Sequence, residues 1–143
     1  MSARPTPKPA KTFVSTAIVL ILATALGVAT AFAKITLNTI DPTATVTDNG
    51  RQIILTGPIQ CDGGQQADLR VTVTQRSTGA VAEGRVLITC TGDTRQWEVR
   101  ALTQGKETFA EGPAIAVASA RTSDHGRTDD AHQWLVGITL VGK

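Results

Sequence analysis

The segment from residue 122 to residue 132 carries the densest set of side chains that could do chemistry. Within it lie three carboxylates and two imidazoles: Asp124, Asp129, Asp130, His125 and His132. Carboxylate oxygens suit Ca²⁺ and imidazole nitrogens suit transition metals, but the spacing matches no EF-hand or zinc motif. Asp and Gly are also ordinary residues of a solvated turn. We therefore predict a mobile loop over residues 122–130 that binds no metal tightly, with metal binding as the open alternative.

The same region supplies the residue types of a hydrolase triad, namely Ser119, Ser123, Asp124 and His125. A triad needs a nucleophile within hydrogen-bond reach of its base and an oxyanion hole, usually built from separated segments. The chain has no GxSxG nucleophile elbow. We predict that the protein is not an enzyme and has no catalytic residue and no cofactor. A hydrolytic protein using residues 122–132 remains the weaker alternative.

Cys61 and Cys90 are the only cysteines. Two cysteines in a small exported domain indicate one disulfide. A zinc site would need four ligands, and no CxxC motif or nearby histidine supplies them. Closing a loop of this length stabilises a fold by about 3.6 kcal/mol in the chain-entropy model.

Export is predicted from residues 13–33, an uncharged run of 21 residues that follows three basic ones. As a helix it would be about 30 Å long, enough to cross a bilayer. Its strongly apolar part is short, however, and Ala31-Phe32-Ala33 offers a small-x-small cleavage pattern. We predict a signal peptide cut between Ala33 and Lys34, with Phe32 as the other possible start. A retained N-terminal helix that anchors the domain outside the membrane is the alternative.

The charge of residues 34–143 is nearly balanced, with 11 basic and 12 acidic side chains. Mixed signs create no field that would steer nucleic acid or anionic lipid to this part of the chain. We therefore predict no nucleic-acid binding, and membrane contact only through residues 13–33 if they are retained.

Period-two alternation runs through the chain after residue 33, and turn residues interrupt it about every ten positions. The expected strands are 35–37 continued by 43–47 past Asp41-Pro42, then 52–61, 69–73, 80–90, 97–101, 114–121 and 134–141. No stretch of residues 34–143 keeps a helical period for three turns. This pattern predicts an all-β fold, an antiparallel immunoglobulin-like β-sandwich of 7–8 strands in residues 34–143, preceded by the hydrophobic helix of residues 1–33.

The alternation also assigns side chains to the two faces of each strand. The residues expected to point inward are Val71, Ile88, Trp97, Val99, Trp134, Val136 and Ile138. Arg70, Thr72 and Arg100 fall on the opposite face, which we interpret as ordinary solvated sheet surface. Both tryptophans are therefore predicted to fill the core rather than to form a ligand platform.

Several short motifs give the chain a resemblance to a known group. They are Gln60-Cys61, Ile88 to Gly92, Trp97-Glu98-Val99, Phe109 to Ala114 and a last strand from Trp134 to Leu140. In these the chain resembles small exported domains of actinobacteria and similar Gram-positive bacteria. The resemblance covers roughly residues 35–141 and implies a β-sandwich with one disulfide. It implies no active site.

The leading functional hypothesis is an exported, non-enzymatic domain that binds a protein or a cell-envelope component. A sheet face, an edge strand or the loops could provide its binding surface. The runner-up is a membrane-anchored surface or filament subunit that keeps residues 1–33.

Overall fold

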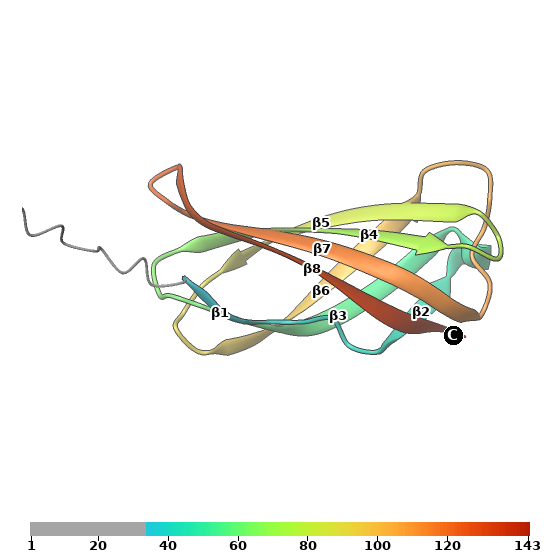
Figure 1. Cartoon of the computed structure of the whole chain (residues 1–143), viewed down its shortest axis with the longest axis horizontal. Helices are drawn as coiled ribbons and strands as arrows, with labels where there is room; N and C mark the ends of the chain where they lie inside the picture. The colour runs from blue at the N-terminus through green and yellow to red at the C-terminus, as the bar shows by residue number, and fades with distance from the viewer. Residues whose placement is uncertain (1–33) are drawn as a thin grey trace, which may run out of the picture. The chain divides into compact units, whose positions relative to one another are not determined.

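The computed structural model describes residues 34–143, which form an all-β domain (Figure 1). Its eight strands are β1 (Ile35–Asn38), β2 (Thr43–Thr47), β3 (Gln52–Cys61), β4 (Gln66–Gln75), β5 (Ala80–Thr89), β6 (Thr94–Thr103), β7 (Gly112–Asp124) and β8 (Arg127–Gly142). One 3₁₀ turn, Asp48–Gly50, joins β2 to β3. The predicted hydrophobic helix and the cleavage site after Ala33 involve residues outside this range. Between Lys34 and Lys143, no helix is long and apolar enough to cross a membrane.

The strands form two layers that meet along both sides. One layer has the order β8-β7-β4-β5, and the other is built from β3, β6 and the short strands β1 and β2. The layers are joined where β2 pairs with β8 and where β5 pairs with β6. Seven strands thus form a closed circuit of hydrogen-bonded neighbours, while β1 adds to the edge of β3.

The prediction that all strand pairs are antiparallel is wrong at β2, which runs parallel to β8. The first strand is split at Asp41-Pro42, because proline has no N–H to continue a ladder. Before the split, β1 pairs with the Ile59–Cys61 end of β3. After it, β2 pairs with the Gln52–Ile54 end and turns its other edge toward the last strand.

The predicted loop over residues 122–130 is also corrected. Strand β7 extends to Asp124 and strand β8 begins at Arg127, so only the two-residue turn His125-Gly126 joins them. Both turn residues have positive φ (49° and 77°), as a type I′ hairpin requires. The polar side chains of this segment therefore project from a hairpin rather than from an irregular loop.

The core follows the predicted alternation. Val71, Trp97, Val99 and Ile138 are buried, and Ile88 lies at the margin of the core. Trp134 and Val136 face the same way but are only partly buried. Strand β7 contributes a row of small side chains to the core, Ala114, Ala116, Ala118 and Ala120, and β3 contributes larger ones such as Leu55 and Ile59 to the same core. This pairing of small with large side chains lets two layers pack closely.

The joint between β5 and β6 depends on a glycine. A Cβ atom at Gly84 would collide with the Val99 side chain and would lie 2.8 Å from the Arg100 carbonyl oxygen. The close approach lets Ala82 and Glu83 pair with the end of β6. Beyond this point the two strands separate.

The disulfide between Cys61 and Cys90 is confirmed, with a Cα–Cα distance of 5.3 Å. Cys61 ends β3 in one layer and Cys90 follows β5 in the other. The bond therefore ties the two layers together. A structural disulfide of this kind is typical of oxidising, extracytoplasmic environments.

Candidate functional site: the outer sheet face

The four-stranded layer presents one broad outward surface, which we call the outer sheet face. Cross-strand partners in an antiparallel sheet point to the same side, so the register places its members. They are Ala131, Gln133, Leu135, Gly137 and Thr139 of β8; Arg121, Ser119, Val117, Ile115 and Pro113 of β7; Asp68, Arg70, Thr72 and Thr74 of β4; and Leu87, Arg85, Glu83 and Val81 of β5.

Arginines gather toward one end of this face, around Asp68. The Arg85 guanidinium donates two hydrogen bonds to the Asp68 carboxylate, at 2.6 and 2.8 Å, and these raise the pKa of Arg85. Arg70 lies 3.7 Å from the same carboxylate. Arg121 makes no ion pair within residues 34–143. Three guanidinium groups around one carboxylate leave this end with net positive charge.

Aliphatic side chains occupy much of the rest of the face. Seven large hydrophobic side chains are exposed in the described residues, and four of them belong to the face: Leu135, Ile115 and Val81 lie away from Asp68, whereas Leu87 lies opposite Asp68 in the cationic end. Leu135 and Val117 are cross-strand partners, and Ile115 lies next to Val117 along the same side of β7. The face therefore combines a cationic end with apolar surface, a mixture common in protein-binding sites.

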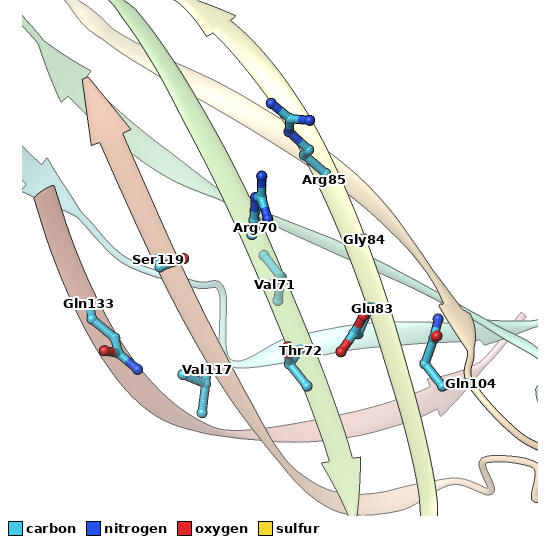
Figure 2. A pocket seen from close by; sticks show the side chains of 10 residues that line it. All are labelled: Arg70, Val71, Thr72, Glu83, Gly84, Arg85, Gln104, Val117, Ser119 and Gln133. Carbon is cyan, nitrogen blue, oxygen red and sulfur yellow. The ribbon is translucent and has the colours of Figure 1, made fainter. Parts of the chain in front are cut away.

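Three hollows indent this face. The central one, of about 580 Å³, is lined by side chains from all four strands (Figure 2). Gln133, Ser119, Arg70 and Arg85 form one row across it in Figure 2. A smaller hollow of about 190 Å³ shares Arg70 and Ser119 and adds Asp68 and Arg121. A third, of about 590 Å³, lies at the other end of the face, where Arg76 lines it together with Ile115 and Pro113.

Comparisons with known proteins identify no family. No family model matches the chain, and no curated protein matches it. Among solved structures, the structure of WR4, a C. elegans MSP family member, matches over 78% of this chain and 100% of that chain. The two are 10% identical with a TM-score of 0.40, and no inference is drawn from this likeness. The single disulfide and β-rich fold implied by the resemblance to small exported actinobacterial domains are present, whereas membership of that group stays a prediction.

Ser119 is not brought to the other residue types of the predicted triad, whereas Ser123, Asp124 and His125 follow one another at the end of the β7–β8 hairpin. Ser119 lies on the outer sheet face, whereas His125 lies at the tip of the β7–β8 hairpin. The five residues 120–124 lie between them in extended strand, so the two are about 20 Å apart. His125 pairs with its neighbour Asp124, and both are exposed. No group of three His, Cys, Asp or Glu side chains in the described part of the chain is placed to hold a metal ion.

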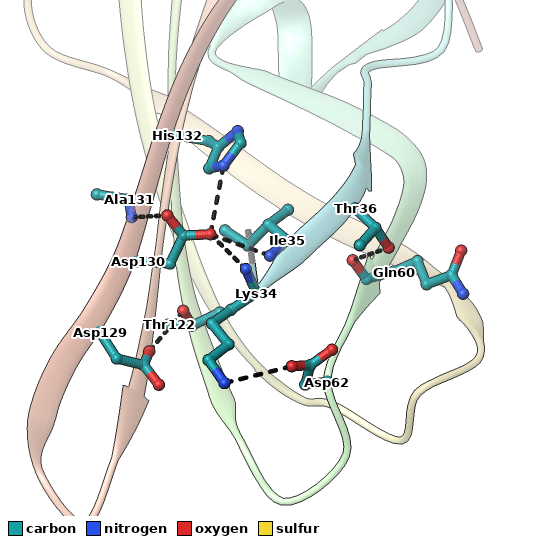
Figure 3. Close-up of polar contacts among 10 residues, drawn as sticks. All are labelled: Lys34, Ile35, Thr36, Gln60, Asp62, Thr122, Asp129, Asp130, Ala131 and His132. Atoms are coloured by element: carbon teal, nitrogen blue, oxygen red, sulfur yellow. Dashed lines mark hydrogen bonds and ion pairs between the residues drawn. The ribbon is translucent and has the colours of Figure 1, made fainter. Parts of the chain in front are cut away.

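Asp130 instead connects β8 to the beginning of β1 (Figure 3). Its carboxylate accepts hydrogen bonds from the backbone N–H groups of Lys34 (2.8 Å), Ile35 (3.1 Å) and Ala131 (2.9 Å). The His132 ring lies 3.3 Å away. Burial of Asp130 opposes its ionisation, but these donors outweigh burial and hold the pKa of Asp130 below its usual range.

We expect Asp130→Asn to remove a pH-dependent part of the stability. A lowered folded-state pKa means that the unfolded chain binds more protons at acidic pH, so stability rises with pH. The contribution is present above the unfolded-state value of about 3.9 and is lost as the pH falls through the lower folded-state value. Denaturant melts from neutral to strongly acidic pH should show a steeper acid loss in the wild type than in the variant. Parallel curves for the two proteins would contradict this role.

Sequence reasoning missed the outer sheet face as a site. The alternation predicts only that Arg70 and Thr72 lie on solvated surface, and it gives no reason to group Arg85 and Arg121 with them. The four residues come from three strands that are separated by turns, so their adjacency depends on register. The sequence does contain one signal of this face. Leu135, Val117 and Ile115 are apolar, although they alternate along their strands with residues that point into the core.

Proposed function

We propose that the protein is an exported, non-enzymatic recognition domain that binds another protein through the outer sheet face. The observation that carries the proposal is the coincidence of three hollows, exposed aliphatic side chains and a cationic cluster on one face. Interfaces commonly place apolar contacts beside polar groups and are enriched in arginine. The partner would present aliphatic side chains to the Ile115 end and acidic groups to the Arg121 end.

A protein partner is favoured over an anionic envelope polymer by the composition of this face. A polyanion would use the arginines but would leave Leu135, Ile115 and Val81 without contacts. Burial of aliphatic surface stabilises by about 25 cal/mol per Å², so these side chains would add affinity only for a partner that covers them. The single disulfide agrees with export into an oxidising compartment.

The test compares variants on the two sides of the domain. Ile115→Lys and Arg121→Glu change the two ends of the outer sheet face, and Leu102→Lys changes β6 in the other layer. Ile115 and Leu102 are similarly exposed, at 43% and 53%, so they form a matched pair. Immobilised full-length variants would capture cell-envelope proteins of the producing cell, quantified by mass spectrometry.

A partner should be retained by the wild type and by Leu102→Lys, and reduced at least about tenfold by each change on the outer sheet face. Hydrogen exchange of the complex should then show protection on β7 and β4. A partner lost with Leu102→Lys but kept with both other variants would place the binding surface on the opposite layer and overturn the proposal.

A further inference from the structure

Strand β8 has an open edge in its first half. On one side β7 pairs with it from Arg127 to Leu140. On the other side β2 covers only Thr139 to Gly142. No strand in residues 34–143 pairs with this second side between Ala131 and Ile138. We call this unpaired stretch of β8 the open window. The contacts of Asp130 with Lys34 and Ile35 lie at one end of it, and Thr139 lies at the other.

The hydrogen bonds on either side of β8 define which backbone groups point to the open edge. The Thr139 N–H donates to the Pro42 carbonyl oxygen at 2.8 Å, so residue 139 faces the β2 side. Backbone groups alternate along a strand, with the N–H and C=O of one residue on the same side. Gln133, Leu135 and Gly137 therefore direct their N–H and C=O groups into the open window.

Within Ala131–Ile138 this edge lacks charged side chains and proline, two of the devices that keep sheet edges from pairing. Natural edges are protected by charged side chains, proline or bulges. The stretch Ala131–Ile138 contains no Lys, Arg, Asp, Glu or Pro, and the β7–β8 bulge, whose extra residue is Asp129 of β8, lies just before this stretch. Where β5 and β6 separate, by contrast, their edges carry charges such as Arg85 and Arg100. The absence of charge means that two copies of this edge could approach without like-charge repulsion.

We propose that two copies of the chain pair antiparallel through the open edge of β8, with Leu135 opposite Leu135 of the second copy. Leu135 is the midpoint between Ala131 and Thr139, so this register fits the window symmetrically. Gln133 then lies opposite Gly137 of the second copy, and six backbone hydrogen bonds form from residues 133, 135 and 137. The two Leu135 side chains, each 66% exposed in one chain, contact each other.

The pairing also accounts for the incomplete burial of two inward-facing residues. In this register Trp134 lies opposite Val136 of the second copy, on the side of the sheet that faces the core. Both are only partly buried in a single chain. A twofold arrangement closes on itself, so it yields a dimer and not a filament. It goes beyond the proposed partner binding, because it uses the strand edge, and it would join two outer sheet faces into one surface.

The test uses the full chain with its disulfide intact, studied over a concentration series by sedimentation and by residue-resolved amide exchange. In the dimer the amides of Gln133, Leu135 and Gly137 should be protected, and dilution should release them. The amides of Trp134 and Val136 face β7, so they should stay protected in both states. This alternation identifies the edge even if residues outside 34–143 also associate.

Leu135→Lys and Leu87→Lys form the matched pair of variants, because both leucines are exposed (66% and 62%) on opposite edges of the same layer. Leu135→Lys should weaken the dimer at least about tenfold, and Leu87→Lys should leave it unchanged. A chain that is monomeric at all concentrations, or a dimer in which the three odd-numbered amides exchange freely, would overturn the proposal. If Leu135→Lys failed to fold, the exchange pattern of the wild type would still decide.

Discussion

Trp97→Ala should lower the free energy of unfolding by about 3–5 kcal/mol, because it removes a large buried side chain and leaves a cavity. Trp97 is 3% exposed and lies opposite Gly57 on β3. A Cβ atom at Gly57 would come within 2.7 Å of the Trp97 ring and would collide with the Thr39 carbonyl oxygen. The indole thus occupies space that only glycine leaves free. A loss of this size is a large share of the 5–15 kcal/mol typical of a domain.

Denaturant melts of a variant series check the assignment. Trp97→Phe should cost much less than Trp97→Ala, because the indole Nε1 has no hydrogen-bond partner within residues 34–143 and only part of the ring is lost. Trp134→Ala should also cost less, since that ring is only partly buried. Thr72→Ala, on the outer sheet face, should change stability by under about 0.5 kcal/mol. Wild-type stability in Trp97→Ala would show that the core does not depend on this ring.

Replacing both cysteines by alanine should destabilise the domain by about 3.6 kcal/mol in the chain-entropy model. The two residues are separated by 29 positions, and the bond joins the ends of β3 and β5 in different layers. Without it, the β5–β6 side would be held mainly by the pairing of Ala82 and Glu83 with β6. Mass spectrometry under non-reducing conditions should find the wild type two hydrogens lighter than its reduced form.

Equilibrium unfolding can separate the stability contributed by the disulfide bond from that contributed by the cysteine side chains. The samples are oxidised wild type, wild type with a reductant, and the double alanine variant. Reduced wild type and the variant should agree closely, because both sulfur sites are buried and small. Thr72→Ala serves again as the surface control. Equal stability of the oxidised and reduced proteins would show that the unfolded chain is already restricted by residual structure.

The strands and their buried faces could be predicted because alternation is a local property. Val71, Trp97 and Val99 were assigned correctly from period two alone, and the disulfide followed from the presence of two cysteines together with the expectation of export. Gln75 shows a local signal that was overlooked. It continues the inward series of β4 with a polar side chain, and it is fully buried, bonded to the backbone of Ala110 (2.8 and 2.9 Å).

Features that depend on how distant strands meet could not be predicted. The parallel pairing of β2 with β8 joins residues almost a hundred positions apart, and nothing in Thr43–Thr47 specifies its partner. Residues 122–130 have the composition of a loop, yet long-range pairing with β4 and local pairing with β8 across the His125-Gly126 turn extend β7 through Asp124. The outer sheet face is a property of register across four strands, so its arginines and leucines became a surface only in the folded chain.

The parallel pairing of β2 with β8 has a mechanical consequence. Lys34 lies beside Asp130 near the start of β8, and Lys143 directly follows the last residue of β8. Once β1 and residues 39–41 have been released from β3, tension between residue 34 and residue 143 would pull β2 and β8 lengthwise in opposite directions. The bonds between Thr43–Val46 and Thr139–Gly142 would be loaded together in shear, and none could open before the others. Because forced unfolding is governed by the unfolding rate, this short parallel patch would determine how long the domain resists a pull along its length.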